Sequence, residues 1–270
     1  MNHIRREFFK TLFQKRTYFG WVGLLLVPFV IAVALKLSTQ TPRGDGQGPG
    51  FFILIKTNGA YVPLAALMAL AAFLLPLLAS MAGSYTIAGE AESGTLRSVL
   101  MEPVGRGALL AAKWFVANLY VAIGLVLMGA GGLLAGWLFF GLKPMTLLSG
   151  GSIGLGHGLW LMALSFLFVF VAMAGVVSMA VFFSTLTNSS LTAVAAALVL
   201  IIIMQVLGAF SVFDFLKPYL ITSHFDAWTG LFKQPIAWDP INKGLIAFGS
   251  YIVGLTGLAW WVFRRKDVLS

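Results

Sequence analysis

The charged residues that could do chemistry in this sequence gather in one segment, from Ile87 to Lys113, between two long apolar stretches. The segment contains three glutamates, two arginines and a lysine, whereas only 10% of all 270 residues are charged. Charges between apolar stretches belong outside hydrocarbon, because an ionised side chain is costly inside a bilayer. The chemistry expected of this segment is therefore recognition, either of lipid headgroups or of another protein.

Motifs for catalysis, metal binding and nucleotide binding do not occur in the sequence. The phosphate-binding pattern G-x-x-x-x-G-K-[ST] is absent, and the run Gly44–Gly50 lacks the lysine and hydroxyl of such a loop. There is no cysteine, and the three histidines, His3, His157 and His224, are not spaced as metal ligands. Neither paired carboxylates, a Ser-His-Asp set nor H-E-x-x-H occurs in the apolar stretches. We therefore expect no catalytic residue, no metal site and no cofactor in this chain.

The composition is that of an integral membrane protein, since 59% of the residues are hydrophobic and several apolar runs exceed the ~20 residues that cross a bilayer. Lys and Arg outnumber Asp and Glu by 18 to 9. In a soluble protein this excess would suggest nucleic acid as a partner. Here most basic residues flank apolar runs, where they orient the chain in the membrane, so no nucleic-acid partner is expected.

Continuous apolar runs predict an all-α, polytopic fold with six transmembrane helices in a single transmembrane domain over residues 1–270. Strands of a membrane barrel would instead alternate over about ten residues. Turn residues at Gly150–Gly158 and Thr185–Ser190 divide the longest apolar stretch. The predicted spans are Phe19–Leu35, Val62–Ala88, Trp114–Leu142, His157–Ser184, Leu191–Val212 and Leu245–Phe263.

The positions of the basic residues predict that both termini are cytoplasmic. Six spans put the termini on one side, together with the segment between the second and third spans. Eleven of the 18 Lys and Arg residues fall on that side: five at the N-terminus, three in the segment and three in the tail. The side richer in Lys and Arg is the cytoplasmic one.

The N-terminal segment, residues 1–18, has the pattern of an amphipathic helix lying in the membrane interface. Apolar residues recur at steps of three and four, and five basic residues occupy the remaining positions. The apolar set is Ile4, Phe8, Phe9, Leu12 and Phe13. The basic set is Arg5, Arg6, Lys10, Lys15 and Arg16. Membrane anchoring and contact with a partner protein are equally compatible with this pattern.

Between the second and third spans, residues 89–112 form a predicted cytoplasmic loop with a short helix at Thr95–Met101. Its apolar edge consists of Leu96, Val99 and Leu100. Pro103 ends the helix, because the residue before a proline avoids the α conformation. Two acidic residues, Glu90 and Glu92, precede the helix, where a negative charge favours the helix N-terminus.

This region resembles the signature between the second and third spans of permease subunits of type 2 ABC transporters. The matching residues are Glu90, Glu92, Gly94, Thr95, Leu96, Leu100, Pro103, Arg106 and Lys113. The resemblance extends to the basic N-terminus, the six spans and the short basic tail. It implies that the loop holds a coupling helix that docks in a groove of a separate ATPase subunit. On this basis Leu96, Val99 and Leu100 would be buried by docking, with Glu90, Glu92 and Arg106 positioning the turn.

The resemblance also implies the composition of the working unit. Two permease subunits, as a homodimer or heterodimer, would associate with two ATPase subunits that bind ATP and Mg²⁺. Such a complex would lie in a prokaryotic inner membrane and move substrate outward, with lipids, amphipathic drugs and peptides all compatible with an apolar pathway. Two alternatives remain: a non-transporting membrane scaffold or immunity protein, and an ion-coupled carrier. The predicted spans lack Asp, Glu, Lys and Arg, which disfavours the carrier.

Three further expectations concern polar or interfacial residues outside the loop. The segment before the last span, residues 213–244, is predicted to lie on the outer side, with Trp228, Leu231 and Phe232 at the interface. Asn188 is expected to cap a cytoplasmic turn. Gln205, the polar residue within the fifth span, is expected to bond to a neighbouring helix rather than face a pathway.

Overall fold

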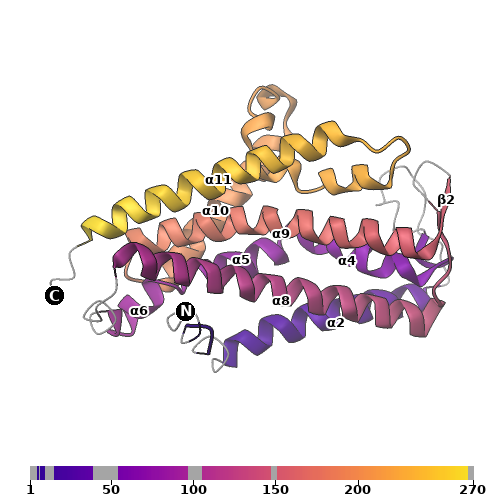
Figure 1. Cartoon of the computed structure of the whole chain (residues 1–270), viewed down its shortest axis with the longest axis horizontal. Coiled ribbons are helices and arrows are strands. Elements are labelled where there is room, and N and C mark those ends of the chain that lie inside the picture. The colour runs from indigo at the N-terminus through magenta and orange to yellow at the C-terminus, as the bar shows by residue number, and fades with distance from the viewer. Residues whose placement is uncertain are drawn as a thin grey trace.

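The structure, a computed structural model, describes residues 5, 7–9, 15–38, 54–96, 105–146 and 151–266. In this part of the chain, long helices run side by side in one elongated bundle (Figure 1). Its α-helices are α2 (Lys15–Leu37), α4 (Val62–Ala71), α5 (Leu74–Ser84), α6 (Ala88–Glu92), α8 (Arg106–Phe140), α9 (Leu155–Leu186), α10 (Ser190–Ala209) and α11 (Trp238–Arg265).

The polytopic all-α prediction is confirmed. Within the described ranges, five helices are long and apolar enough to cross a membrane: α2, α8, α9, α10 and α11. A sixth crossing requires α4 and α5 to form one span across a 64° bend. Helix α9 is central, because 67% of its most apolar window is buried, against 11% for α11.

The second span was predicted as one continuous helix, and this is wrong. Helix α4 ends at Ala71, α5 begins at Leu74, and α5 ends four residues before the predicted Ala88. The cause is Pro76, which has no N–H to donate to the carbonyl of Ala72 four residues earlier. Lipid offers no replacement donor, so a protein group must supply one. The side-chain amide of Gln205 on α10 donates to this carbonyl, as expected for an interhelical bond.

Two other spans begin at least seven residues earlier than predicted, at the starts of α8 and α11. Helix α8 begins at Arg106, eight residues before Trp114, since Ala, Leu and Lys fill the interval. Its 35 residues measure about 50 Å, more than the ~30 Å of a bilayer core. Helix α11 begins at Trp238, with Asp239 in its first turn, where the helix dipole favours an acid.

The end of the bundle away from the chain termini is held by close backbone packing (Figure 1). A 3₁₀ turn, η1 (Gly59–Tyr61), meets α8 so closely that a Cβ on Gly136 would lie 2.0 Å from the Gly59 carbonyl oxygen. Asn58 fixes the chain beyond α8, since its amide donates to the Lys143 and Pro144 carbonyls. A short antiparallel hairpin follows, in which β1 (Met145–Thr146) pairs with β2 (Ser152–Ile153).

The second half of the segment between α10 and α11, from Leu220 to Phe232, packs against the bundle, whereas Val212, Phe215 and Tyr219 before it are exposed. It is a chain of 3₁₀ turns whose aromatic residues Trp228 and Phe232 are 0% and 1% exposed. Ile221 lies against Gly175 in α9, where an added Cβ would meet its side chain at 2.7 Å. The side chains of Trp228, Leu231 and Phe232 are therefore buried against α9 and α11, and the outer position of residues 213–244 stays a prediction. The turns are η2 (Ser211–Phe213), η3 (Lys217–Tyr219), η4 (Ile221–His224) and η5 (Ala227–Phe232).

Candidate functional site

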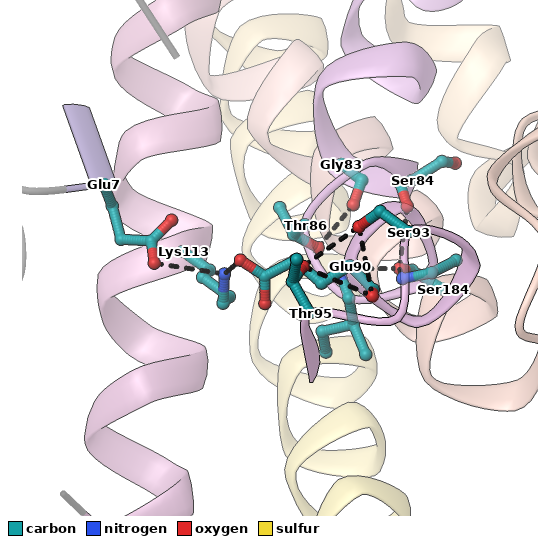
Figure 2. Close-up of polar contacts among 11 residues, drawn as sticks. Glu7, Gly83, Ser84, Thr86, Glu90, Ser93, Thr95, Lys113 and Ser184 are labelled. Atoms are coloured by element: carbon teal, nitrogen blue, oxygen red, sulfur yellow. Dashed lines mark hydrogen bonds and ion pairs between the residues drawn. The ribbon is translucent and has the colours of Figure 1, made fainter. Parts of the chain in front are cut away.

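Polar side chains from four helices meet around the short helix α6, at the end of the bundle where α8 begins (Figure 2). Figure 2 shows carboxylate, ammonium and hydroxyl groups linked in a chain from Glu7 through Lys113 to the backbone of α6. We call this set the α6 cluster. Its members are Glu7, Ser84, Glu90, Glu92, Ser93, Lys113, Ser184 and Ser190.

A serine from α9 joins α5 to α6. The hydroxyl of Ser184 donates to the carbonyl of Ser84, at the end of α5, over 2.8 Å. The same oxygen accepts from the backbone N–H groups of Ile87, at 3.1 Å, and Ala88, at 2.7 Å. One buried hydroxyl thus satisfies the last turn of one helix and the first N–H groups of the next, which otherwise lack partners.

Gly94 ends α6 in a Schellman motif. The N–H of Gly94 donates to the Ala91 carbonyl, and the N–H of Thr95 donates to the Glu90 carbonyl at 3.0 Å. Gly94 has φ of +69°, a left-handed conformation that is costly for residues with a Cβ. Ser93 adds a hydroxyl bond to the same Glu90 carbonyl. The glycine and threonine of the resembling motif therefore have a structural reason to occur where α6 stops.

A buried lysine links α6 to α8 and to the N-terminal segment. Lys113 Nζ lies 2.7 Å from a carboxylate oxygen of Glu90 and 3.2 Å from one of Glu7. The Lys113 and Glu90 side chains are 2% and 5% exposed, whereas that of Glu7 is 18% exposed. Removing one member of such a buried pair leaves an uncompensated charge, so the pair constrains how α6 sits against α8.

Glu92 links α6 to the start of α10. Its carboxylate accepts from the Ser190 backbone N–H at 2.9 Å and from the Ser190 hydroxyl. Ser190 is the first residue of α10, where N–H groups lack helical partners and the dipole favours negative charge. The N-cap itself is Ser189, whose side chain accepts from Thr192. The helix cap is thus Ser189, one residue after Asn188, whose expected role in the turn stays a prediction.

Arg106 connects the start of α8 to the end of α11. Its guanidinium donates to three carbonyls in the last turn of α11, those of Phe263, Arg264 and Lys266. A cation at a helix C-terminus is favoured both by the dipole and by these unpaired carbonyls. Lys266 in turn donates to the Thr187 carbonyl between α9 and α10, and partial burial lowers the pKa of Lys266.

A cavity of about 560 Å³ opens beside the α6 cluster. Helices α5, α6 and α8 form its walls, and tyrosines Tyr85 and Tyr120 line it with Thr17 of α2. Three carboxylates face it, those of Glu7, Glu90 and Glu92. The Lys113 and Glu90 side chains that link α6 to α8 also line this space.

Three of the eight members of the α6 cluster are identified from the sequence: Glu90, Glu92 and Lys113. Glu90, Glu92, Gly94, Thr95 and Arg106 do come together at one end of the bundle, whereas Leu96 is 3% exposed and packs into the subunit's own core. Val99, Leu100 and Pro103 lie outside the described residues, as do Arg6 and Lys10. Of the other N-terminal cations, Arg5 stacks on Phe9, and Lys15 and Arg16 begin α2.

Sequence reasoning missed the partners of the glutamates. Lys113 was read as a loop residue, although the helix-forming run before it could have placed it in α8. The serines Ser184 and Ser190 flank a predicted turn, and nothing in their spacing shows that they reach back to α6. Glu7 is the single acid among the basic residues of the N-terminus, and that isolation was a signal for a specific partner.

Comparisons with known proteins agree with this architecture. A family model described as ABC-2 family transporter protein matches residues 1–268. A probable ABC transporter permease protein NosY from Stutzerimonas stutzeri is 43% identical over 68 residues, 25% of this chain and 24% of that protein. The protein of the same name from Pseudomonas aeruginosa is 43% identical over 60 residues, 22% of each chain. The matched regions thus span about a quarter of these relatives. Because the family model covers nearly the whole sequence, the chain belongs to the ABC-2 family of transporter proteins.

Proposed function

We propose that this chain is the membrane-spanning subunit of an ATP-driven transporter, and that a separate ATPase moves it through α6 and the segment that follows. The observation that carries the proposal is the attachment of α6 to three long helices. Polar groups bond it to α8 through Glu90 and to α9 through Ser184, which are both buried, and to α10 through Glu92, which is exposed.

Such an attachment suits the transmission of force. Helix α6 follows α5 after a three-residue turn, so a push on α6 acts directly on the bent span. Each polar link is partly or wholly buried, where electrostatic interactions are stronger than in water. A displacement of α6 would therefore move α8, α9 and α10 together, whereas a flexible loop would absorb it.

The working unit in this proposal contains two permease subunits, identical or different, and two ATPase subunits that bind ATP and Mg²⁺. The complex lies in a prokaryotic inner membrane with the α6 cluster on the cytoplasmic side, and it exports its substrate. Family membership supports the pairing with an ATPase. The two relatives are named as permease proteins of ABC transporters, which supports the same division of labour.

The predicted apolar edge of the loop consists of Leu96, Val99 and Leu100. Because Leu96 is buried, it has a different role in this proposal from the other two. Leu96 anchors the loop in the subunit's core, so docking falls to the residues after it, among them Val99 and Leu100. Leu100→Ala should weaken copurification of the ATPase while leaving the thermal unfolding of the isolated subunit unchanged. Leu96→Ala should lower subunit stability by about 2–5 kcal/mol. The assignment is wrong if Leu100→Ala destabilises the isolated subunit as much as Leu96→Ala does.

Glu92 tests coupling separately from docking. Glu92→Ala removes both bonds to Ser190 and should leave the ATPase bound but reduce its turnover in the reconstituted complex. Glu92→Gln keeps an oxygen that can accept both bonds and should retain most of the turnover. Copurification and ATP hydrolysis are measured on the same preparations. If Glu92→Ala hydrolyses ATP at the unmutated rate with the same response to the membrane subunit, the α6 cluster is a structural anchor and the coupling role fails.

The division of labour makes a direct prediction for the isolated chain. Without an ATPase partner it should show no saturable, stoichiometric ATP binding in equilibrium dialysis, because it lacks a phosphate-binding loop. Stoichiometric binding would instead require a nucleotide site in this subunit and would remove the reason for a separate ATPase.

Topology is open to labelling because the chain contains no cysteine. Asn188 and Ser211 are both exposed and lie at opposite ends of α10. With the α6 cluster in the cytoplasm, a membrane-impermeant thiol reagent applied to intact cells should label Ser211→Cys but not Asn188→Cys. Labelling of both positions, or of Asn188→Cys alone, would contradict the proposed orientation.

A further inference from the structure

A groove of about 400 Å³ runs between α8 and α11 on the outside of the bundle, on a different face of α8 from the cavity beside α6. Its walls are apolar or small on both helices. On α8 they are Gly107, Leu110, Ala111 and Trp114, and on α11 they are Ile252, Val253, Thr256, Gly257 and Trp260. Since α11 is the least buried of the long helices, this groove faces the surroundings of the bundle.

Glycines and one tryptophan give the groove its shape. A Cβ added at Gly107 would meet the indole nitrogen of Trp260 at 2.8 Å, so this glycine makes room for the ring. A Cβ at Gly257 would meet nothing within 4 Å, which places open space beside α11 at that level. The indole of Trp260 therefore bounds the groove at the level of Gly107, and the space beside Gly257 is open.

Basic side chains stand where the groove reaches the end of α11. Residues 253, 257, 260 and 264 recur at steps of three and four and share one stripe of that helix. Arg264 therefore lies one turn beyond Trp260, the last residue of α11 that lines the groove, and its guanidinium lies 5.5 Å from the ring centre of Trp260. On the neighbouring stripe Arg265 lies 4.1 Å from the ring centre of Trp261. Stacking holds both cations at the C-terminal end of α11.

We propose that this groove binds one anionic phospholipid, with an acyl chain between α8 and α11 and the phosphate at Arg264. The inference does not depend on the proposed coupling role of α6. An apolar channel that leads to a guanidinium matches a molecule with an apolar chain and an anionic head, and a planar guanidinium forms paired hydrogen bonds with phosphate oxygens. Basic pockets between transmembrane helices are suited to anionic headgroups, which supports lipid over a peptide segment as the occupant.

The charge requirement is tested by lipid titration of delipidated protein, followed by native mass spectrometry with phosphatidylglycerol and phosphatidylcholine of identical chains. Phosphatidylglycerol should bind about fivefold more tightly, the factor expected for one basic residue near a headgroup. Arg264→Gln should abolish that preference. Lys36→Gln is the matched control, because Lys36 also stacks on an aromatic ring, 5.1 Å from the centre of Phe139, at the other end of the bundle. The Lys36 variant should keep the preference.

The groove itself is tested by filling it. Gly257→Leu places a side chain in the open space and should weaken binding of both lipids at least tenfold. Gly254→Leu is the control, since it lies on the same helix, also has nothing within 4 Å, and does not line the groove. The two lipids binding alike to the native chain, Arg264→Gln keeping the preference, or Gly254→Leu acting as strongly as Gly257→Leu would each overturn the proposal.

Discussion

Gly94 shows how a single backbone angle fixes the geometry of the site. It and Gly105 are both exposed glycines of the segment between α6 and α8, and a Cβ would meet nothing within 4 Å at either position. They differ in conformation, because Gly94 has φ of +69° whereas Gly105 has φ of −61°. An added methyl group should therefore change the free energy of unfolding at these two positions through backbone strain alone.

Gly94→Ala should lower the free energy of unfolding by about 1–2 kcal/mol, the cost of a left-handed residue with a Cβ. Gly105→Ala should change it by less than about 0.5 kcal/mol. Thermal unfolding of the purified subunit measures both, and hydrogen exchange should show faster opening of α6 in the first variant alone. Equal effects of the two substitutions would mean that the Schellman motif does not determine where α6 ends.

At the scale of elements, hydropathy predicted the helices well because lipid exposure demands long apolar runs. It did not predict their ends, since Arg106 to Lys113 are helix-forming residues that need no lipid, and α8 continues through them. The break in the second span could have been predicted from Pro76. Its partner could not be identified, because the bond from Gln205 depends on how α10 packs against α5. The partners of Glu90 and Glu92 could not be predicted for the same reason, because they are distant in sequence.

The bent span makes a double-mutant prediction. Gln205→Leu should lower the free energy of unfolding by about 1 kcal/mol, because the Ala72 carbonyl loses its donor. In a Pro76→Ala background the new N–H can bond to that carbonyl, so Gln205→Leu should cost much less. Thermal unfolding of the four proteins measures the coupling. An equal loss in both backgrounds would show that Gln205 does not act through the carbonyl freed by Pro76.

Across the whole molecule, the two ends of the bundle are held in different ways. Side-chain bonds around α6 hold one end, and direct backbone packing of η1 on α8 holds the other. The cavity beside the α6 cluster gives α6 and the helices bonded to it space to move together, whereas two backbones in contact cannot move closer. The end with the α6 cluster is therefore the end at which α8 has freedom to shift.

Gly136→Ala should accordingly be damaging, since its methyl group would lie 2.0 Å from the Gly59 carbonyl oxygen. We expect a loss of at least about 1–3 kcal/mol in the free energy of unfolding. Gly156→Ala, in the first turn of α9 with nothing within 4 Å, should be close to neutral. Denaturation of the two variants in the same detergent makes the comparison, and a neutral Gly136→Ala would show that η1 and α8 can separate without cost.

The hydrogen bond between Gln205 and Ala72 also has a consequence for biogenesis. The two residues are 133 positions apart, so the ribosome delivers the bent span to the membrane long before α10 has been made. During that interval the Ala72 carbonyl has no amide from α10 and must stay near water or the membrane surface. Stable insertion of the second membrane crossing, formed by α4 and α5, therefore requires that the fifth crossing, α10, has been inserted. Truncated chains that end before α10 should leave residues around Ala72 accessible to aqueous reagents, and full-length chains should protect them.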